Sequence, residues 1–478
     1  MFRKLITGLM ISMAAFSVSA QEITTVSPAA RERLTVTIYN QGIGLVKDVR
    51  KVSLKQGDNQ IAFSDISDQM IPESVFVSGN GVTVQEQNFN FDLLTHDNMM
   101  QKAVGSTVDI EWTNPATGAT ETQKAQILAF NYGEPVLKIG NKIETKYPGR
   151  ILFNQIPKNL WSKPTLILDL MSKQAATEEI ELSYLSNGIN WKADYVAELN
   201  DTDDKMDLNG LVTLTNNTQV SYENATLQLV AGSVNITRPQ PRVMYKASAM
   251  MLAENATMDS AMGTEQLGDY YLYTLDRPTD ILSNQTKQVA LLSGDHVTVQ
   301  KQYKFTDTIN VAYTTDFKDV KPSVFLTFEN KKEDGLGLPL PKGTVRVYKK
   351  DQNNRLIFVG EDNIDHTAVQ QKVTLRLGQA FDITAAGKKT SYTAIGKDAY
   401  EAGFEVALNN AMKTPVQVRF EQRLPNNWRI LSESQKSMKE NANTVYWNVD
   451  IPPEGQTILT FKVQIQKETA ASAKAKAQ

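Results

Sequence analysis

Three histidines are the side chains in this sequence best suited to acid–base or metal chemistry, because an unperturbed imidazole changes its charge near neutral pH. They are His96, His296 and His366, and they lie far apart along the chain. A fold could still gather them, since a catalytic group is recognised by geometry and not by chain order. His366 has the richest surroundings, because residues 360–367 place acidic side chains beside the imidazole, where they could bind a divalent cation or share a proton. The interpretation that we favour is a polar hairpin connection whose side chains cap backbone groups.

A dense group of acidic residues is the second place where chemistry could occur. Hard cations such as Ca²⁺ bind where several oxygen ligands converge on one loop. Asp201 and Asp203 have the Asp-x-Asp spacing found at the start of such loops. The glycine and the terminal glutamate of a calcium loop are not at the required positions. We therefore favour a solvated turn between two strands, because aspartate is an ordinary turn-forming residue. The group consists of Asp201, Asp203, Asp204 and Asp207.

Aromatic side chains form a third candidate site. Tyr184, Trp191 and Tyr195 lie on either side of an Asn-Gly turn and could form a stacking platform for sugar rings. Large rings more often fill the core beside a hairpin, and we favour that interpretation. The same two interpretations, with the same preference, apply to Trp161, Trp428 and Trp447.

The known sequence signatures of catalysis are absent. There is no G-x-S-x-G, H-E-x-x-H or G-x-x-x-x-G-K-[ST] motif, and residues 42–44 and 335–337 lack the third glycine of a dinucleotide-binding loop, so we interpret both as turns. The chain has no cysteine, which excludes disulfides and thiolate sites. We therefore assign no catalytic, cofactor-binding or metal-binding residue and expect no cofactor. Paired carboxylates for hydrolysis have no sequence signature, since their separation is a three-dimensional quantity.

Alternation of apolar and polar residues dominates the chain and predicts β-strands with one dry and one wet face, which is typical of antiparallel sheets. Turn-forming residues separate these segments at short intervals, as at 187–188, 351–354 and 452–455. The sequence predicts an all-β fold made of antiparallel, immunoglobulin-like β-sandwich domains and a small β-barrel-like module. The clearest alternating segments are residues 34–39, 212–215, 227–229, 345–348, 373–377, 416–420 and 461–465.

Helical patterns are nearly absent. Residues 95–104 predict one short helix, with Thr95 as its N-cap and Met99 and Met100 on its buried side. A second short helical piece is expected at residues 434–440.

The first residues have the three-part layout of a secretory signal. Arg3 and Lys4 precede an apolar run over residues 5–16, and small residues lead to a cleavage site expected after Ala20. The apolar run is shorter than the ~20 residues that a spanning helix needs, so no membrane span is expected after cleavage. The lack of cysteine fits an oxidising compartment, and we expect the protein in the periplasm or outside the cell. The net charge of −3 and the absence of a basic stripe argue against nucleic-acid binding.

Composition also predicts boundaries along the chain. Residues 241–268 carry scattered methionine and alanine without a strand period, which indicates a flexible linker or loop. The predicted units are a signal peptide (1–20), an N-terminal β unit (21–103), a small β-module (104–157), a β-sandwich unit (158–240), the linker (241–268), a C-terminal β-sandwich domain (269–466) and a disordered tail (467–478).

Several segments together resemble the bacterial family called domain of unknown function 4139. The resemblance spans most of the mature chain and keeps the order of the segments. It implies a secretory signal, β-rich halves and a variable middle loop, and it implies no established activity or functional residue. The segments are residues 34–42, 184–195, 211–217, 230–235, 338–348 and 360–367.

These observations favour an exported envelope protein that binds an unknown envelope protein or polysaccharide through sandwich loops and sheet edges, without catalysis. The alternative is a carbohydrate- or peptide-active hydrolase with carboxylates on sandwich loops. A third possibility is a transmembrane barrel, whose strands would need ~9–11 residues and aromatic girdles.

Overall fold

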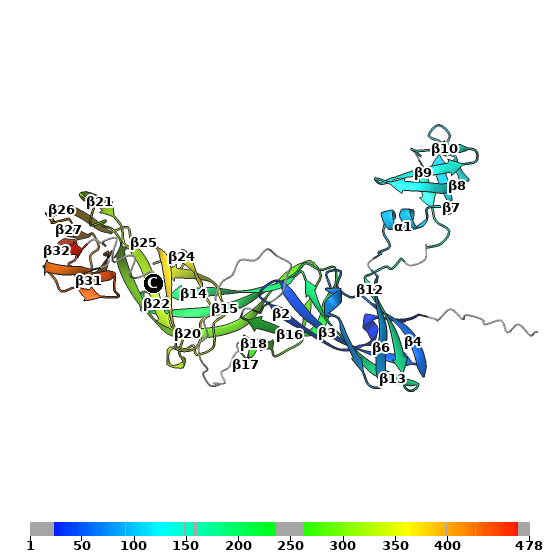
Figure 1. Ribbon diagram of the computed structural model, residues 1–478, viewed down its shortest axis with the longest axis horizontal. Coiled ribbons are helices and arrows are strands. Elements are labelled where there is room, and N and C mark those ends of the chain that lie inside the picture. The colour runs from blue at the N-terminus through cyan, green and yellow to red at the C-terminus, as the bar shows by residue number, and fades with distance from the viewer. Residues whose placement is uncertain are drawn as a thin grey trace, which may run out of the picture.

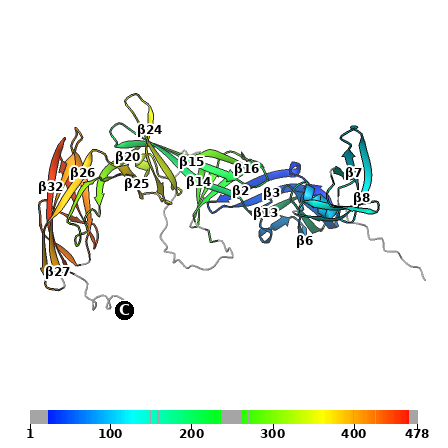
Figure 2. The ribbon, with the colours of Figure 1, turned by 90° about the horizontal axis from the view of Figure 1, so that it is seen from above.

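The computed structural model describes residues 23–90, 92–147, 149–156, 160–232, 234–235, 262–268, 270–397, 399–425 and 427–466. Figure 1 shows an elongated molecule with the N-terminal strands near one end, the C-terminal strands at the other and a small module set apart from the body. Figure 2 shows the same end-to-end order of the body from above. The only α-helix among the described residues is α1 (His96–Lys102), so the expected all-β fold is confirmed.

Two sheets form the N-terminal part of the body. The smaller sheet has the strand order β1 (Thr24–Val26), β4 (Gly57–Ser64), β12 (Thr165–Ser172) and β6 (Val82–Asn90). The larger sheet has the order β17 (Met262–Leu267), β18 (Tyr270–Leu275), β16 (Tyr222–Ala231), β2 (Arg31–Tyr39), β3 (Ile43–Leu54), β13 (Ala176–Asn187) and β5 (Phe76–Gly79), and β19 (Thr279–Ile281) pairs with β16.

Two further sheets form the middle and the C-terminal end. The ten-stranded sheet has the order β24 (Leu356–Ile364), β23 (Gly343–Lys350), β14 (Ile189–Leu199), β15 (Lys205–Asn216), β20 (Gln285–Thr306), β28 (Val416–Arg423), β31 (Thr444–Ile451) and β30 (Met438–Lys439), with β22 (Ser323–Glu329) paired to β20 and to β25 (Lys372–Gln379). The five-stranded sheet has the order β21 (Asp316–Val320), β26 (Ile383–Ile395), β27 (Ala399–Asn410), β32 (Gly455–Gln466) and β29 (Trp428–Glu433).

The small module is an antiparallel sheet that adjoins α1. Its order is β10 (Lys142–Glu144), β9 (Glu134–Ile139), β8 (Thr120–Asn131), β7 (Thr107–Thr113) and β11 (Arg150–Leu152). The sheet does not close into a barrel, because β10 and β11 are its two edges. Three 3₁₀-helical turns complete the elements of the described residues, at Pro28–Ala30, Pro72–Ser74 and Lys332–Asp334.

The alternating apolar positions face the interior, as the sequence predicted. In β2, Leu34, Val36 and Ile38 are buried, and the corresponding positions of β15, β16, β23, β25, β28 and β32 are buried as well. One continuous core fills the N-terminal and middle sheets. A second core lies between the five-stranded sheet and strands β28 and β31, which together form the C-terminal sandwich. The small module has a separate core that includes Met100. The period-two pattern therefore predicted which side chains the sheets bury.

The 22-residue strand β20 joins the middle of the molecule to its C-terminal end. Its first part pairs with β15, its next part with β22 and its last residues with β28. Because one continuous strand takes part in both the middle sheet and the C-terminal sandwich, the two parts share backbone hydrogen bonds as well as a chain connection.

The structure differs from the sequence expectations in three respects. Residues 434–440 form no helix, because this segment runs along β31 and contributes the two-residue strand β30, so that tertiary pairing outweighs a weak local preference. Strand β17 lies inside the predicted linker of residues 241–268 and pairs with β18, while residues 236–261 lie outside the described part of the chain. The sheets are mixed and not purely antiparallel, since β1–β4, β2–β16, β14–β23 and β20–β28 are parallel pairs.

The expected signal peptide and C-terminal tail also lie outside the described residues. Among the residues that are described, no helix has the length and apolar character needed to cross a membrane.

Candidate functional site

The structure keeps the three histidines in different places. His96 is the first residue of α1 in the small module, whereas His296 lies in β20, where its backbone N–H donates to Asp207 Oδ1 at 2.8 Å. His366 follows β24, and its Nδ1 accepts a hydrogen bond from the backbone N–H of Lys342 at 3.2 Å. The histidines therefore do not form one shared site.

His366 lies in the segment that follows β24, and its side chain caps a backbone N–H group. This agrees with the polar connection favoured from the sequence. Burial is the main cause that lowers the pKa of His366, and the positive charge of Lys342 lowers it further, so the imidazole is neutral at pH 7. Because Nδ1 accepts a hydrogen bond, the proton of the neutral ring is on Nε2. Nε2 lies 3.2 Å from Nδ2 of Asn40, a residue of the β2–β3 turn.

The acidic group forms separate local contacts. Asp203 accepts hydrogen bonds from the ammonium groups of Lys301 at 2.8 Å and Lys349 at 2.5 Å. Burial opposes ionisation of Asp203, but these two hydrogen bonds outweigh it and lower its pKa. Asp204 instead pairs with Asn200 and Thr202 inside the turn between β14 and β15. These contacts stabilise a turn, as the sequence favoured.

The aromatic platform considered from sequence is part of the core. Tyr184, Trp191 and Tyr195 are all buried, and the hydroxyl of Tyr195 donates to Pro341 O at 2.7 Å. Trp447 is also buried, while Trp161 and Trp428 are half-buried. The four buried rings therefore present no free stacking surface of the kind that a sugar ring needs.

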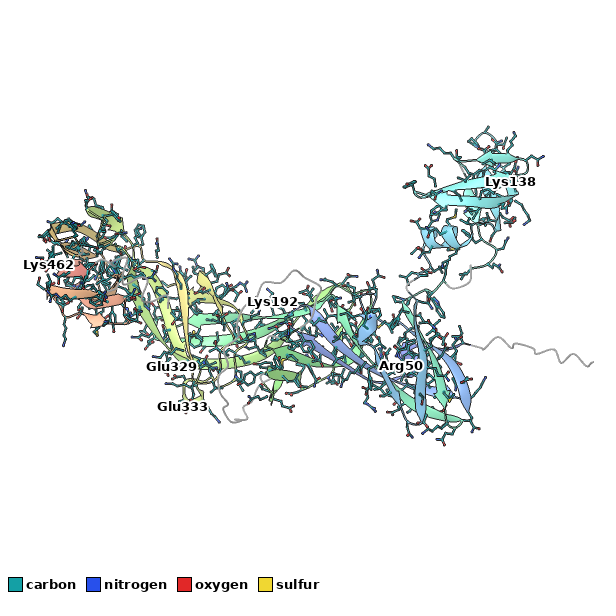
Figure 3. The ribbon with its side chains drawn as sticks, in the orientation of Figure 1. Arg50, Lys138, Lys192, Glu329, Glu333 and Lys462 are labelled. Atoms are coloured by element: carbon teal, nitrogen blue, oxygen red, sulfur yellow. The ribbon has the colours of Figure 1, made fainter. Side chains whose placement is uncertain are left out.

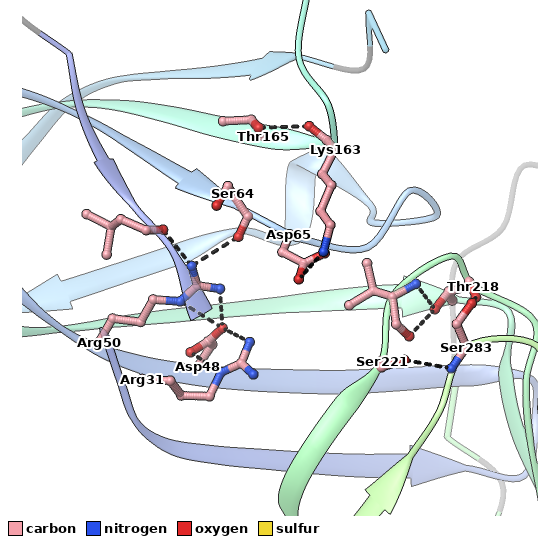
Figure 4. Close-up of polar contacts among 12 residues, drawn as sticks. Arg31, Asp48, Arg50, Ser64, Asp65, Lys163, Thr165, Thr218, Ser221 and Ser283 are labelled. Atoms are coloured by element: carbon pink, nitrogen blue, oxygen red, sulfur yellow. Dashed lines mark hydrogen bonds and ion pairs between the residues drawn. The ribbon is translucent and has the colours of Figure 1, made fainter. Parts of the chain in front are cut away.

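A buried ionic cluster on β3 was not predicted from the sequence. Asp48 lies between Arg31 and Arg50, and the guanidinium of Arg50 also donates to Val26 O at 2.7 Å and Ser64 O at 3.0 Å (Figure 4). Burial disfavours the Asp48 carboxylate, but hydrogen bonds from both arginines outweigh this and lower its pKa. The cluster ties β1 and β4 to β3. The alternating pattern of β3 could have indicated this burial. Asp48 and Arg50 occupy alternate positions in line with the buried Val46 and Val52, so all four side chains point to the same face of the strand.

A cavity of about 770 Å³ lies in the small module. This volume is within the range of pockets that hold small ligands. Its apolar lining includes Met100, Ile151 and Phe153. Its ionisable lining residues include His96, Glu134, Lys146 and Arg150.

Tyr147 lines this cavity, and its hydroxyl is buried. That hydroxyl has no hydrogen-bond partner among the described residues. Burial and the negative charge of Glu121 raise the pKa of Tyr147, so the phenol stays protonated at neutral pH and can donate a hydrogen bond. Because buried polar groups are nearly always satisfied, this hydroxyl is a donor with capacity to bind a ligand.

Local structure positions the lining of this cavity. Thr95 caps α1 by accepting from the backbone N–H of Asn98 at 3.2 Å, which fixes His96 at the start of the helix. Arg150 pairs with Glu111 on the neighbouring strand. Gly149 has no room for a side chain, because a β-carbon there would collide with Glu111 O and the ring of Tyr147. The sequence analysis considered His96 but not Tyr147 or Arg150. These two residues flank a Pro-Gly pair, which indicates a turn and gives no sign of a binding site.

Two family models match the chain. A model described as a domain of unknown function, DUF4139, matches residues 180–467, which is more than half of the chain. The chain belongs to the DUF4139 family. The DUF4139 match begins in β13 and extends through the C-terminal sandwich. A second model, described as an N-terminal domain of unknown function, DUF4140, matches residues 36–111.

No curated protein matches the chain. The resemblance noted from sequence is thus confirmed at the level of the DUF4139 family.

Proposed function

We propose that this DUF4139 protein is exported to the cell envelope and works by non-catalytic binding, with the cavity of the small module as its ligand site. The observation that carries the proposal is the buried, unpartnered hydroxyl of Tyr147 in a cavity of about 770 Å³. A ligand that accepts a hydrogen bond there would satisfy a donor that the described part of the protein leaves unpaired.

The position of the module supports a binding role. Figure 1 shows it standing away from the sheets of the body. The two segments that lead to it pair at their base, where Leu94 N donates to Trp161 O at 2.8 Å and Trp161 N donates to Asp92 O at 3.0 Å. Lys102 at the end of α1 forms an ion pair with Asp92 at 2.7 Å. This paired base holds the cavity clear of the body, where a large partner can approach it.

The lining of the cavity suggests the chemistry of its ligand. Lys146 and Arg150 are the lysine and arginine of the lining, and Glu134 is its single acidic residue. Arg150 is already paired with Glu111, so Lys146 is the cation most available to a ligand. Together with the apolar side chains, these groups fit an acidic group that carries an apolar portion, on either a protein or a polysaccharide of the envelope.

The test compares retention of envelope components on the immobilised mature protein and on two variants. We expect Tyr147→Phe and Lys146→Gln to lose most of the material that the wild type retains, because one removes the free donor and the other a cation. Retention should also fall with added salt, since exposed charges are screened.

Lys138→Gln is the matched control, because Lys138 is an exposed cation on β9 of the same module and does not line the cavity (Figure 3). Equal retention by wild type, Tyr147→Phe and Lys146→Gln would contradict the proposal. Release of reducing ends or free amines from the retained material would favour the hydrolase.

The hydrolase alternative has one observation in its favour. Asp382 and Glu454 lie on loops of the C-terminal sandwich and line the same depression. Both side chains are exposed, whereas a carboxyl that must hold a proton at neutral pH needs an apolar environment. The pair therefore fits hydrogen bonding to a ligand better than general acid catalysis.

A further inference from the structure

A depression of about 700 Å³ lies at one end of the C-terminal sandwich, far along the chain from the small module. It forms where β26 and β32 begin and β27 ends, in the strand group at the left of Figure 1. Loops at the ends of a sandwich are common binding sites, because the sheets hold them in place. The polar and aromatic residues that line it include Phe381, Asp382, Thr384, Asn409, Glu454 and Gln456.

A row of polar side chains forms the floor of this depression. Thr384, Asn409 and Gln456 lie opposite one another on three neighbouring strands. Gln456 Nε2 donates to Asn409 Oδ1 at 2.7 Å, and Asn409 Nδ2 donates to Thr384 Oγ1 at 3.5 Å. These bonds orient both amides and leave the carbonyl oxygen of Gln456 and the hydroxyl proton of Thr384 available to a ligand.

An aromatic ring stands beside the polar row. Phe381 is 80% exposed, which is unusual for so large an apolar side chain next to a hydrogen-bonding surface. The ammonium of Lys321 lies 4.2 Å from the centre of the ring and covers one of its faces. The exposed area therefore includes the opposite face, which is free to stack against a flat apolar surface.

The loops that carry these groups are fixed before any ligand arrives. The buried side chain of Asn410 donates to Thr414 O at 2.9 Å and Pro452 O at 3.0 Å, which ties the β27–β28 loop to the β31–β32 loop. The backbone N–H of Ala411 donates to Asp382 O at 2.8 Å, and that of Glu454 donates to Met412 O at 2.9 Å. A preformed site loses less conformational entropy on binding than a loose one.

We propose that this depression binds a neutral saccharide without cleaving it. A pyranose has an apolar C–H face that matches the free face of Phe381, and its hydroxyl groups both donate and accept hydrogen bonds. Oriented polar groups match adjacent hydroxyls: the carboxylates of Asp382 and Glu454 and the carbonyl oxygen of Gln456 accept hydrogen bonds, and the hydroxyl of Thr384 donates one. The carboxylates of Asp382 and Glu454 outnumber the single ammonium of Lys321. The site therefore repels the carboxylate of an acidic sugar. This site is separate from the small-module cavity, so it stands whether or not that cavity binds a ligand.

The test measures binding of defined sugars to the full mature protein by isothermal titration calorimetry. The probes are tetrasaccharides of glucose and of N-acetylglucosamine, with tetragalacturonate as the acidic comparison. We expect a neutral tetrasaccharide to bind with a Kd in the range of about 1 mM or tighter, and more tightly than tetragalacturonate. Phe381→Ala should weaken that binding about ten-fold, and Phe381→Tyr should retain it because the ring face remains.

Tyr313→Ala is the matched control, because Tyr313 is an aromatic residue of the C-terminal half that is 83% exposed and does not line the depression. Since Phe381 is mostly exposed, its replacement should leave the melting temperature unchanged, and Gln456→Ala provides a second variant that removes the polar contact alone. The proposal is overturned if no neutral probe binds, if the acidic probe binds more tightly, if Phe381→Ala binds like the wild type, or if the bound sugar is hydrolysed.

Discussion

At the residue scale, the most consequential side chain for stability is the fully buried Arg50. Its guanidinium contacts Asp48 and two backbone carbonyl oxygens from different strands, and it lies over the ring of Phe63 at 5.1 Å (Figure 4). Removing one partner from a buried ion pair is costly, because the charge that remains has no water to replace the lost partner.

We therefore predict that Arg50→Met lowers the free energy of unfolding by about 3 kcal/mol or more, even though Arg31 still pairs with Asp48. Urea denaturation followed by tryptophan fluorescence measures the change. Arg33→Met is the control, because Arg33 forms an exposed ion pair with Glu179 that is expected to contribute less than about 1 kcal/mol. Equal losses in the two variants would show that burial of the cluster does not matter.

At the element scale, α1 shows how a short helix depends on its cap. It spans two turns, so its own hydrogen bonds are too few to stabilise it alone. The side chain of Thr95 satisfies one free N–H at its start, and Asn98 Nδ2 donates to Leu93 O at 2.8 Å in the segment before it. Thr95 thus positions both Met100 in the module core and His96 at the cavity.

We predict that Thr95→Ala destabilises α1 by about 1 kcal/mol, because a helix N–H loses its acceptor. Amide hydrogen exchange of residues 97–102 should become faster, while exchange in β7 and β8 changes less. Thr95→Ser keeps the hydroxyl and should exchange like the wild type. Unchanged exchange in Thr95→Ala would mean that packing of Met100 alone fixes the helix.

At the scale of the whole molecule, lysine side chains occur from one end to the other. Figure 3 shows Lys138 in the small module, Lys192 towards the middle of the body and Lys462 at the far end. Lys192 and Lys462 form ion pairs with Asp194 and Glu401.

Export is a property of the whole chain, and it depends on the first residues. We predict that the mature protein begins at Gln21, because the sequence has the layout of a signal peptide cleaved after Ala20. N-terminal sequencing of the protein recovered from periplasmic and extracellular fractions tests this. A cytosolic product that keeps Met1 would contradict the proposal, and a variant with Ala20→Arg should accumulate uncleaved.

The fold class and the buried faces could be predicted from the amino-acid sequence, because side chains alternate across a strand and the period can be read without knowing any partner strand. Leu34, Val36 and Ile38 illustrate this, as does the cap of α1, which depends only on neighbours in the chain. The tertiary structure alone decided which strands are parallel and where β17 and β30 pair, because register and pairing depend on contacts between distant segments.

The candidate sites could not be predicted from the sequence either, because they too depend on contacts between distant segments. Tyr147 became a candidate only when folding buried its hydroxyl without a partner, and Phe381 only when folding left its ring exposed beside Asn409 and Gln456. Neither property follows from residue type or spacing, since burial and proximity arise when segments far apart in the chain are packed together.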